Sequence, residues 1–161
     1  MEISLFTKCL FEFIGTLVLV LLGDGVVAST VLKRSKGFDG GWIVITIAWG
    51  LAVMCGVLIA GPYSGAHLNP AVSVGLAVAG SFPWAYVPGY VAAQLLGGFC
   101  GAVVVYLYYK DHFDATDDPA AKLGVFCTMP AIMDKPRNLF CEVVGTFLLV
   151  FVILAIGNEQ N

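Results

Sequence analysis

The sequence predicts an all-α membrane protein with four transmembrane helices and one re-entrant half-helix. The first observation is composition: of 161 residues, 59% are hydrophobic and 12% are charged, with a mean hydropathy of +0.90. Soluble domains average roughly 25% charged residues. The second is a set of four apolar runs long enough to cross about 30 Å of hydrocarbon, at residues 9–32, 42–61, 84–109 and 138–156. The third is a shorter apolar segment, residues 70–78, which as a helix rises only about 13 Å and so ends within the membrane.

Charge and cysteine content exclude several classes of protein. The net charge is −3 and no long run of Lys and Arg occurs, so a nucleic-acid-binding surface is excluded. The five cysteines form no C-x-x-C pair, which indicates neither a disulfide framework nor a zinc site. No nucleophile, base and orienting group share a recognisable spacing, so we expect no enzyme activity, cofactor or metal.

The polar segment 110–137 separates the third and fourth apolar runs. It contains five aspartates, and we expect an aqueous loop whose aspartates are solvated rather than metal-binding. The chain is thus read as one membrane domain, residues 1–161, with a first repeat at 1–109, this loop, and the start of a second repeat at 138–161.

An internal repeat supports this division. A shift of 130 residues superposes Glu12 on Glu142, together with the rest of a shared E-x-x-G-T-x-x-L-V pattern. Chance similarity of two Leu/Val-rich helices is the alternative, but the match includes the glutamates of the apolar runs. Inverted repeats of this kind are typical of channels and transporters whose midplane site is formed by broken helices.

The stretch 61–68 lies at membrane depth and is rich in residues that disfavour helices. Non-helical backbone survives there only when it is buried in protein or lines a watery cavity. We expect extended backbone, with the carbonyl groups of Gly65, Ala66 and His67 facing a lumen as a row of acceptors.

Asn69, Pro70 and Ala71 form the start of the short helix. Asn caps free N–H groups with its side chain, and Pro fits the first helical position. The positive end of a helix dipole at midplane repels cations, while the Asn amide can donate to a passing hydroxyl. This arrangement favours neutral solutes over ions and protons.

At this point the sequence resembles the major intrinsic protein family of aquaporins and aquaglyceroporins, most closely its bacterial glycerol uptake facilitators. The residues that support the resemblance are 11–16, 48–53, 64–73, Gln94 with 97–101, and 111–123. The resemblance implies a passive pore for glycerol, water and other small neutral solutes. It also implies a homotetramer in a lipid bilayer, in the plasma membrane and specifically the bacterial inner membrane.

The resemblance also implies roles for individual residues. Trp49, twenty positions before Asn69, takes the place of the aromatic residue at the narrowest constriction, where an indole gives a polyol an apolar wall; an ordinary buried Trp is the alternative. Four residues are expected on the apolar side of the lumen, although plain helix packing suits each equally: Leu19, Val53, Leu68 and Val72.

Supporting residues are implied in the same way. Glu12 and Glu142 each brace the backbone of a re-entrant loop, and Gln94 is a further structural support. For His67 two interpretations stay open: a hydrogen-bonding group in the lumen, or an imidazole held by a backbone carbonyl. Gly97 and Gly101 have a G-x-x-x-G spacing that permits close helix contact.

The sequence departs from the family pattern in two respects. Complete members have six spans, two half-helices and an Arg after the second motif, whereas the 161 residues contain one motif and no such Arg. A non-conducting fragment that needs a complementary chain is therefore an alternative, as is a pore selective for water or another small solute. Family topology places the amino terminus inside, with Lys8 as the one basic residue there, whereas the positive-inside rule favours the opposite orientation. We expect the orientation that the family motif implies.

Overall fold

The computed structural model describes residues 3–157, and within that range every regular element is a helix. The four long helices match the four predicted spans, and the short helix matches residues 70–78 at both ends. The helices are α1 (Leu5–Val31), α2 (Gly41–Ser64), α3 (Pro70–Val78), the 3₁₀ turn η1 (Trp84–Tyr86), α4 (Val87–Tyr108), α5 (Lys110–Ala115), α6 (Pro119–Gly124) and α7 (Lys135–Ile156).

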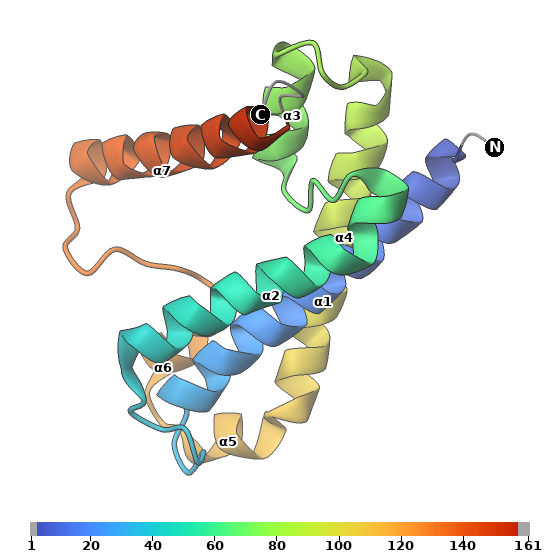
Figure 1. Ribbon diagram of the computed structural model, residues 1–161. Coiled ribbons are helices and arrows are strands. Elements are labelled where there is room, and N and C mark those ends of the chain that lie inside the picture. Colours follow the sequence, from blue (N-terminus) through green and yellow to red (C-terminus); the bar gives the residue numbers. More distant parts are fainter. Residues whose placement is uncertain (1–2, 158–161) are drawn as a thin grey trace.

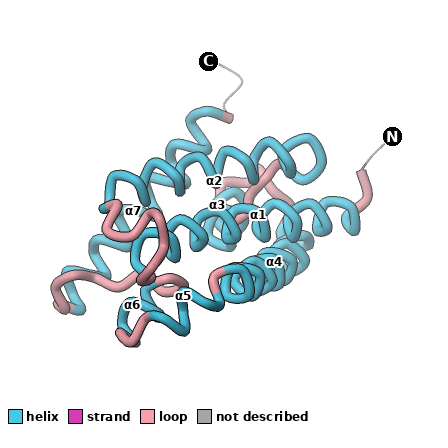
Figure 2. Tube along the Cα trace, turned by 90° about the horizontal axis from the view of Figure 1, so that it is seen from below, coloured by secondary structure: helices cyan, strands magenta, loops and turns pink. Residues whose placement is uncertain are grey.

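α1 is the centre of the bundle and packs against both α2 and α4 (Figures 1 and 2). Glycines make the α1–α4 contact close. A methyl group at Gly97 would lie 2.4 Å from the carbonyl oxygen of Phe13, and one at Gly101 would lie 2.7 Å from that of Leu17. The close helix contact predicted from the G-x-x-x-G spacing is therefore confirmed.

Capping residues explain why two helices begin before the predicted boundaries, and a third helix ends later than predicted. Ser4 accepts from the N–H of Thr7, so α1 begins at Leu5 rather than near residue 9. Asp134 caps α7, which begins at Lys135 rather than 138. α2 continues through Pro62 to Ser64, so the prediction of non-helical backbone at 61–64 is wrong.

The polar segment 110–137, predicted as an aqueous loop, contains the two short helices α5 and α6. α6 starts at an Asp118 cap followed by proline, a local signal of the same kind as Asn69-Pro70. The segment folds back on the α1–α2 turn: the N–H of Lys33 donates to Thr116 Oγ1 at 2.9 Å, and His112 Nδ1 lies 3.1 Å from the Lys33 carbonyl oxygen. No group of three potential metal ligands occurs in residues 3–157.

α7 stands apart from the bundle (Figure 1). It touches α3, where a methyl group on Gly75 would lie 2.7 Å from Val150 Cγ1. None of its described residues is buried, although it is as long and apolar as the other three candidate membrane spans. The chain is thus a multi-pass membrane protein in which one span is largely uncovered by the rest of the described residues.

Candidate functional site

The half-helix α3 begins inside the bundle at Asn69. The Asn69 side-chain oxygen accepts from the N–H of Ala71 at 2.8 Å, and Pro70 occupies the first helical position. Asn69 itself is extended, with φ −153° and ψ 127°. The capped helix start predicted from Asn69-Pro70 is confirmed, because side-chain capping depends only on residues two positions apart.

The backbone before α3 turns repeatedly through the left-handed region. Gly65, Ala66 and Leu68 have φ values of 85°, 50° and 52°. The prediction of extended backbone is therefore wrong here too. For non-glycine residues this conformation costs about 1–2 kcal/mol each, and such strain persists only where surrounding contacts fix the chain.

Glu12, fully buried on α1, fixes this loop. Its Oε1 accepts from Ser64 Oγ at 2.6 Å and from the N–H of His67 at 2.9 Å. Its Oε2 accepts from the N–H of Leu68 at 2.7 Å and from Gln94 Nε2 at 2.8 Å. One carboxylate thus joins α1, the end of α2, the loop and α4, with four donors for its two oxygens.

Glu12 also determines where the loop carbonyls point. In a trans peptide the carbonyl of one residue is opposite to the N–H of the next, and the described residues contain no cis peptide. Because the N–H groups of His67 and Leu68 point at Glu12 and that of Ala66 points at Ser64 Oγ, the carbonyls of Gly65, Ala66 and His67 point away from this buried cluster. Between residues 3 and 157, no hydrogen bond ends on those three oxygens.

A second layer of side chains holds the Glu12 cluster. Gln94 Nε2 also donates to Ser73 Oγ at 3.1 Å, and Tyr90 Oη donates to the Ser64 carbonyl at 2.7 Å. The His67 ring is 2.9 Å from Ser73 Oγ through Nδ1 and packs on Tyr90 with 4.9 Å between ring centroids. In this structure a serine hydroxyl, rather than a backbone carbonyl, fixes the imidazole.

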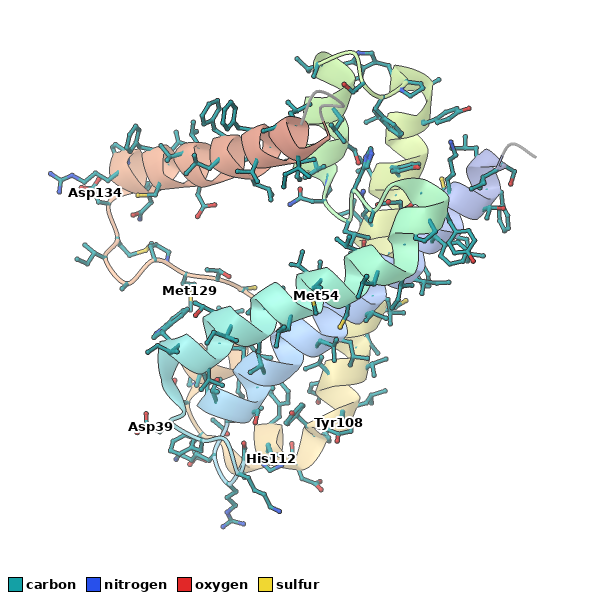
Figure 3. The ribbon with its side chains drawn as sticks, viewed as in Figure 1. Asp39, Met54, Tyr108, His112, Met129 and Asp134 are labelled. Carbon is teal, nitrogen blue, oxygen red and sulfur yellow. The ribbon has the colours of Figure 1, made fainter. Side chains whose placement is uncertain are left out.

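Two cavities lie at opposite ends of the α1–α2 pair. One of about 420 Å³ is lined by the start of α1 and the end of α2, up to Gly65. The other, of about 810 Å³, is lined by the last turns of α1, the start of α2 down to Trp49, and residues 120–129. Two of its lining residues, Asp39 in the α1–α2 turn and Met129 before α7, are labelled in Figure 3.

The other expected site residues differ from one another in their burial and contacts. Leu68 is 7% exposed, with its methyl groups against Gly15 and Gly56, and Val72 is buried, so both side chains pack between helices here. Leu19 is half-buried and Val53 is exposed. Trp49 is half-buried against α1, where a methyl group on Gly23 would lie 2.5 Å from its ring.

Glu142, the repeat counterpart of Glu12, lies exposed on α7. Within the described residues its side chain has no hydrogen bond or ion pair, and a methyl group on Gly145 would have no neighbour within 4 Å. The bracing role expected for Glu142 thus has no counterpart among the contacts of residues 3–157.

Four residues that the structure brings into the site are not predicted from the sequence. Ser64, Ser73 and Tyr90 belong to the Glu12 cluster, and each is a polar group within an apolar stretch at membrane depth, which is the signal that identifies them. The fourth, Asp24, lies on α1 in the wall of the larger cavity and is 7% exposed. It gives the same signal.

These features define a class: an all-α, multi-pass membrane protein with a half-helix that begins inside the bundle. The sequence profile of the major intrinsic protein family matches residues 1–161. The chain belongs to that family.

Individual relatives agree with this assignment. The chain is 57% identical to a probable glycerol uptake facilitator protein of Thermotoga maritima over 94% of its own length and 64% of the relative. It is 52% identical to the glycerol uptake facilitator protein of Bacillus subtilis, over 92% and 54%. The structure of the aquaglyceroporin from Plasmodium falciparum matches with 39% identity and a TM-score of 0.66, over 73% of this chain and 48% of that one. The chain therefore spans less than two thirds of each of these relatives.

Proposed function

We propose that the chain forms part of a passive channel for glycerol and other small neutral solutes, water included, that excludes ions and protons. The observation that supports this most directly is the orientation of the loop before α3. Three successive carbonyls point away from the buried Glu12 cluster, and the capped helix start at Asn69 follows them. Together they offer acceptors and then a donor to a solute that has left bulk water.

The polarity of the half-helix favours neutral solutes. The start of α3 has N–H groups without helical partners, although Pro70 contributes none, and it carries about half a positive charge. Asn69 occupies one of these groups, while its own amide N–H groups donate to no described residue. A cation at this point meets a positive helix end, whereas a hydroxyl or water oxygen can accept from the amide.

Trp49 supports glycerol as the main solute. Its half-buried indole lies in the wall of the larger cavity, beside Gly23 of α1. An aromatic face suits the C–H side of a polyol, while its hydroxyls meet polar groups on the other side. Two relatives named above are glycerol uptake facilitators by name, and we extend that activity to this chain by proposal. A pore selective for water or another small solute is the alternative that a permeability ratio decides.

Stopped-flow light scattering on proteoliposomes tests the proposal. The gene product, expressed from its complete coding sequence, should take up glycerol many-fold faster than empty vesicles. Asn69→Ala removes both the cap and the amide donor, and should lower glycerol permeability about tenfold. Leu95→Ala, a change at an exposed residue on α4 that lines neither cavity, serves as the control and should leave uptake unchanged. Glycerol uptake by the wild type equal to that of empty vesicles would refute the function.

The open surface of α7 favours a second arrangement, in which residues 1–161 do not conduct alone. Its side chains are apolar and unburied, and Glu142 has no described partner. We propose that further protein segments, from the same gene or a complementary chain, cover this surface and complete the pore in a homotetramer in the bacterial inner membrane. Residues 1–161 in proteoliposomes should then show no glycerol uptake above the lipid background; uptake equal to that of the complete product would contradict this.

A further inference from the structure

Asp24 is an ionisable residue in a transmembrane helix, and the mechanism above does not use it. It lies on the inner face of α1, 7% exposed, and contributes to the wall of the 810 Å³ cavity. Among residues 3–157 no hydrogen bond or ion pair involves its carboxylate. A carboxylate at membrane depth is costly unless something donates to it. The cavity is the place from which such a donor can come.

The cavity wall supplies no partner of its own for Asp24. No Lys, Arg or His is found among the described residues that line it. Two of its hydroxyl groups are already engaged, because Thr30 donates to the Val26 carbonyl at 3.0 Å and Thr46 donates to that of Ile43 at 3.1 Å. The Thr128 hydroxyl and the indole N–H groups of Trp42 and Trp49 also lie in this wall, and none of them donates to Asp24 in this structure. Water or a solute in the cavity can supply the missing donors.

The chemistry around Asp24 restricts the solute. Asp24 and Trp49 line the same cavity, and Gly23, the residue next to Asp24 in the chain, packs against the Trp49 ring, so the cavity combines a carboxylate with an aromatic surface. Asp39, in the α1–α2 turn at the edge of the same cavity, adds a second acidic group that disfavours anions (Figure 3). A small molecule that fits has hydroxyl donors along one edge and carbon along the other.

We propose that Asp24 is a specificity-determining residue that accepts hydrogen bonds from the hydroxyls of a small polyol as its carbon skeleton lies on Trp49. This inference rests on the proposed channel function and adds a solute-binding role to the wall of the larger cavity. A neutral solute with two adjacent hydroxyls can donate one to each carboxylate oxygen. A solute with acceptors alone gains nothing from this residue.

Binding of this kind has a distinctive kinetic signature. A binding site outside the narrowest constriction does not change the barrier measured from bulk solution, so permeability at low glycerol concentration stays the same. It does set the concentration at which uptake saturates. Loss of a hydrogen bond to a carboxylate should raise the half-saturating concentration about tenfold in Asp24→Ala. Asp24→Asn retains one acceptor oxygen and should raise it about threefold.

The experiment measures uptake of radiolabelled glycerol against concentration in proteoliposomes of the gene product expressed from its complete coding sequence. The variants are Asp24→Ala and Asp24→Asn, with Asp111→Asn as the matched control. The control removes the same charge, but at an exposed residue of α5 that does not line the cavity. The expected result is a raised half-saturating concentration in the two Asp24 variants alone, with low-concentration permeability within about twofold of wild type in all three.

Each other outcome has a definite meaning. An unchanged half-saturating concentration in both Asp24 variants overturns the inference and leaves the channel function intact. A fall in low-concentration permeability without a change in saturation means that Asp24 is structural, which also overturns it. If glycerol uptake by the wild type changes when choline replaces potassium in the buffer, and uptake by Asp24→Asn does not, the ligand of Asp24 is a cation. This result refutes the polyol role. A wild type that takes up no glycerol refutes the channel function and this inference together.

Discussion

Replacement of Glu12 by Gln tests the role of this carboxylate in orienting the loop before α3. Glu12 accepts from four donors through two oxygens. An amide of the same shape has one acceptor oxygen and one NH₂ group, which is a donor only. Whichever way the amide at position 12 turns, its NH₂ group faces one of the two pairs of donors that bind the carboxylate in the wild type. The pairs are Ser64 Oγ with the N–H of His67, and the N–H of Leu68 with Gln94.

The free-energy cost of Glu12→Gln depends on whether the side-chain amide of Gln94 can rotate. Its Oε1 is buried without a partner among the described residues, so rotation of the Gln94 amide lets this oxygen accept from the new NH₂ group. The N–H of Leu68 then remains unpaired. Loss of one hydrogen bond to a charged group costs about 1.5–3 kcal/mol. If Gln94 cannot turn, two such bonds are lost and the cost is about 3–6 kcal/mol.

Amide hydrogen exchange measures this cost at the loop itself. Local opening exposes the N–H groups to solvent, and its free energy sets their exchange rate. Because each 1.4 kcal/mol is tenfold, Glu12→Gln should speed exchange at Leu68 by about 10- to 100-fold if Gln94 turns, and by more than about 100-fold if it does not. Mass spectrometry of peptides that cover residues 64–69 measures this rate. Glu142→Gln is the matched control. It changes the equivalent repeat position, which is exposed and far along the chain, and should leave these peptides unchanged.

The reasoning fails if residues 64–69 exchange at the same rate in Glu12→Gln and in the wild type. It also fails if Glu142→Gln accelerates them equally, because the effect would then reflect general loosening of the protein. A uniform rise in exchange over all helices would likewise show that Glu12 stabilises the bundle as a whole rather than orienting this loop.

Two further substitutions test helix contacts and the constriction. Gly97→Ala places a methyl group 2.4 Å from a main-chain oxygen of α1 and should destabilise the bundle by about 1–3 kcal/mol, measured as unfolding in rising concentrations of SDS. The control is Gly98→Ala, whose methyl group would lie 3.7 Å from its nearest neighbour and should change stability little. Equal unfolding midpoints for the two variants would contradict the close contact. Gly23→Ala pushes the indole of Trp49 from its place and should lower glycerol permeability several-fold in stopped-flow measurements, whereas Gly25→Ala, with no neighbour within 4 Å, should not; equal uptake would show that the indole position does not limit glycerol.

Local chemistry explains which parts of the fold could be predicted from the sequence. The ends of α3 were predicted correctly because the Asn69 cap and the Pro70 start depend on adjacent residues. The apolar runs locate the four long helices for a similar reason, since length and hydropathy are local properties. Asp118-Pro119 is an equally local start signal for α6, although the charge of the surrounding segment by itself favours a loop.

Contacts between distant residues explain the parts that could not be predicted. α2 continues past Pro62 to Ser64, and the Ser64 hydroxyl donates a hydrogen bond to Glu12, which is 52 residues away in the chain. The wall around Asp24 includes residues 120–129, which fold back over the end of α1. A lone aspartate in an apolar run gives no indication of that neighbour, so its location in a cavity could be found only from the structure.

The donor set of Glu12 limits how this part of the protein can change during evolution. Two of its four donors are side chains, at Ser64 and Gln94, and these can change together with the residue at position 12. The other two are main-chain N–H groups, at His67 and Leu68, which remain donors under every substitution except proline. No set of replacements at the other positions can therefore compensate fully for loss of this carboxylate. In a library of random variants, we expect position 12 to tolerate fewer residues than position 94, and revertants of Glu12 variants to restore the glutamate itself.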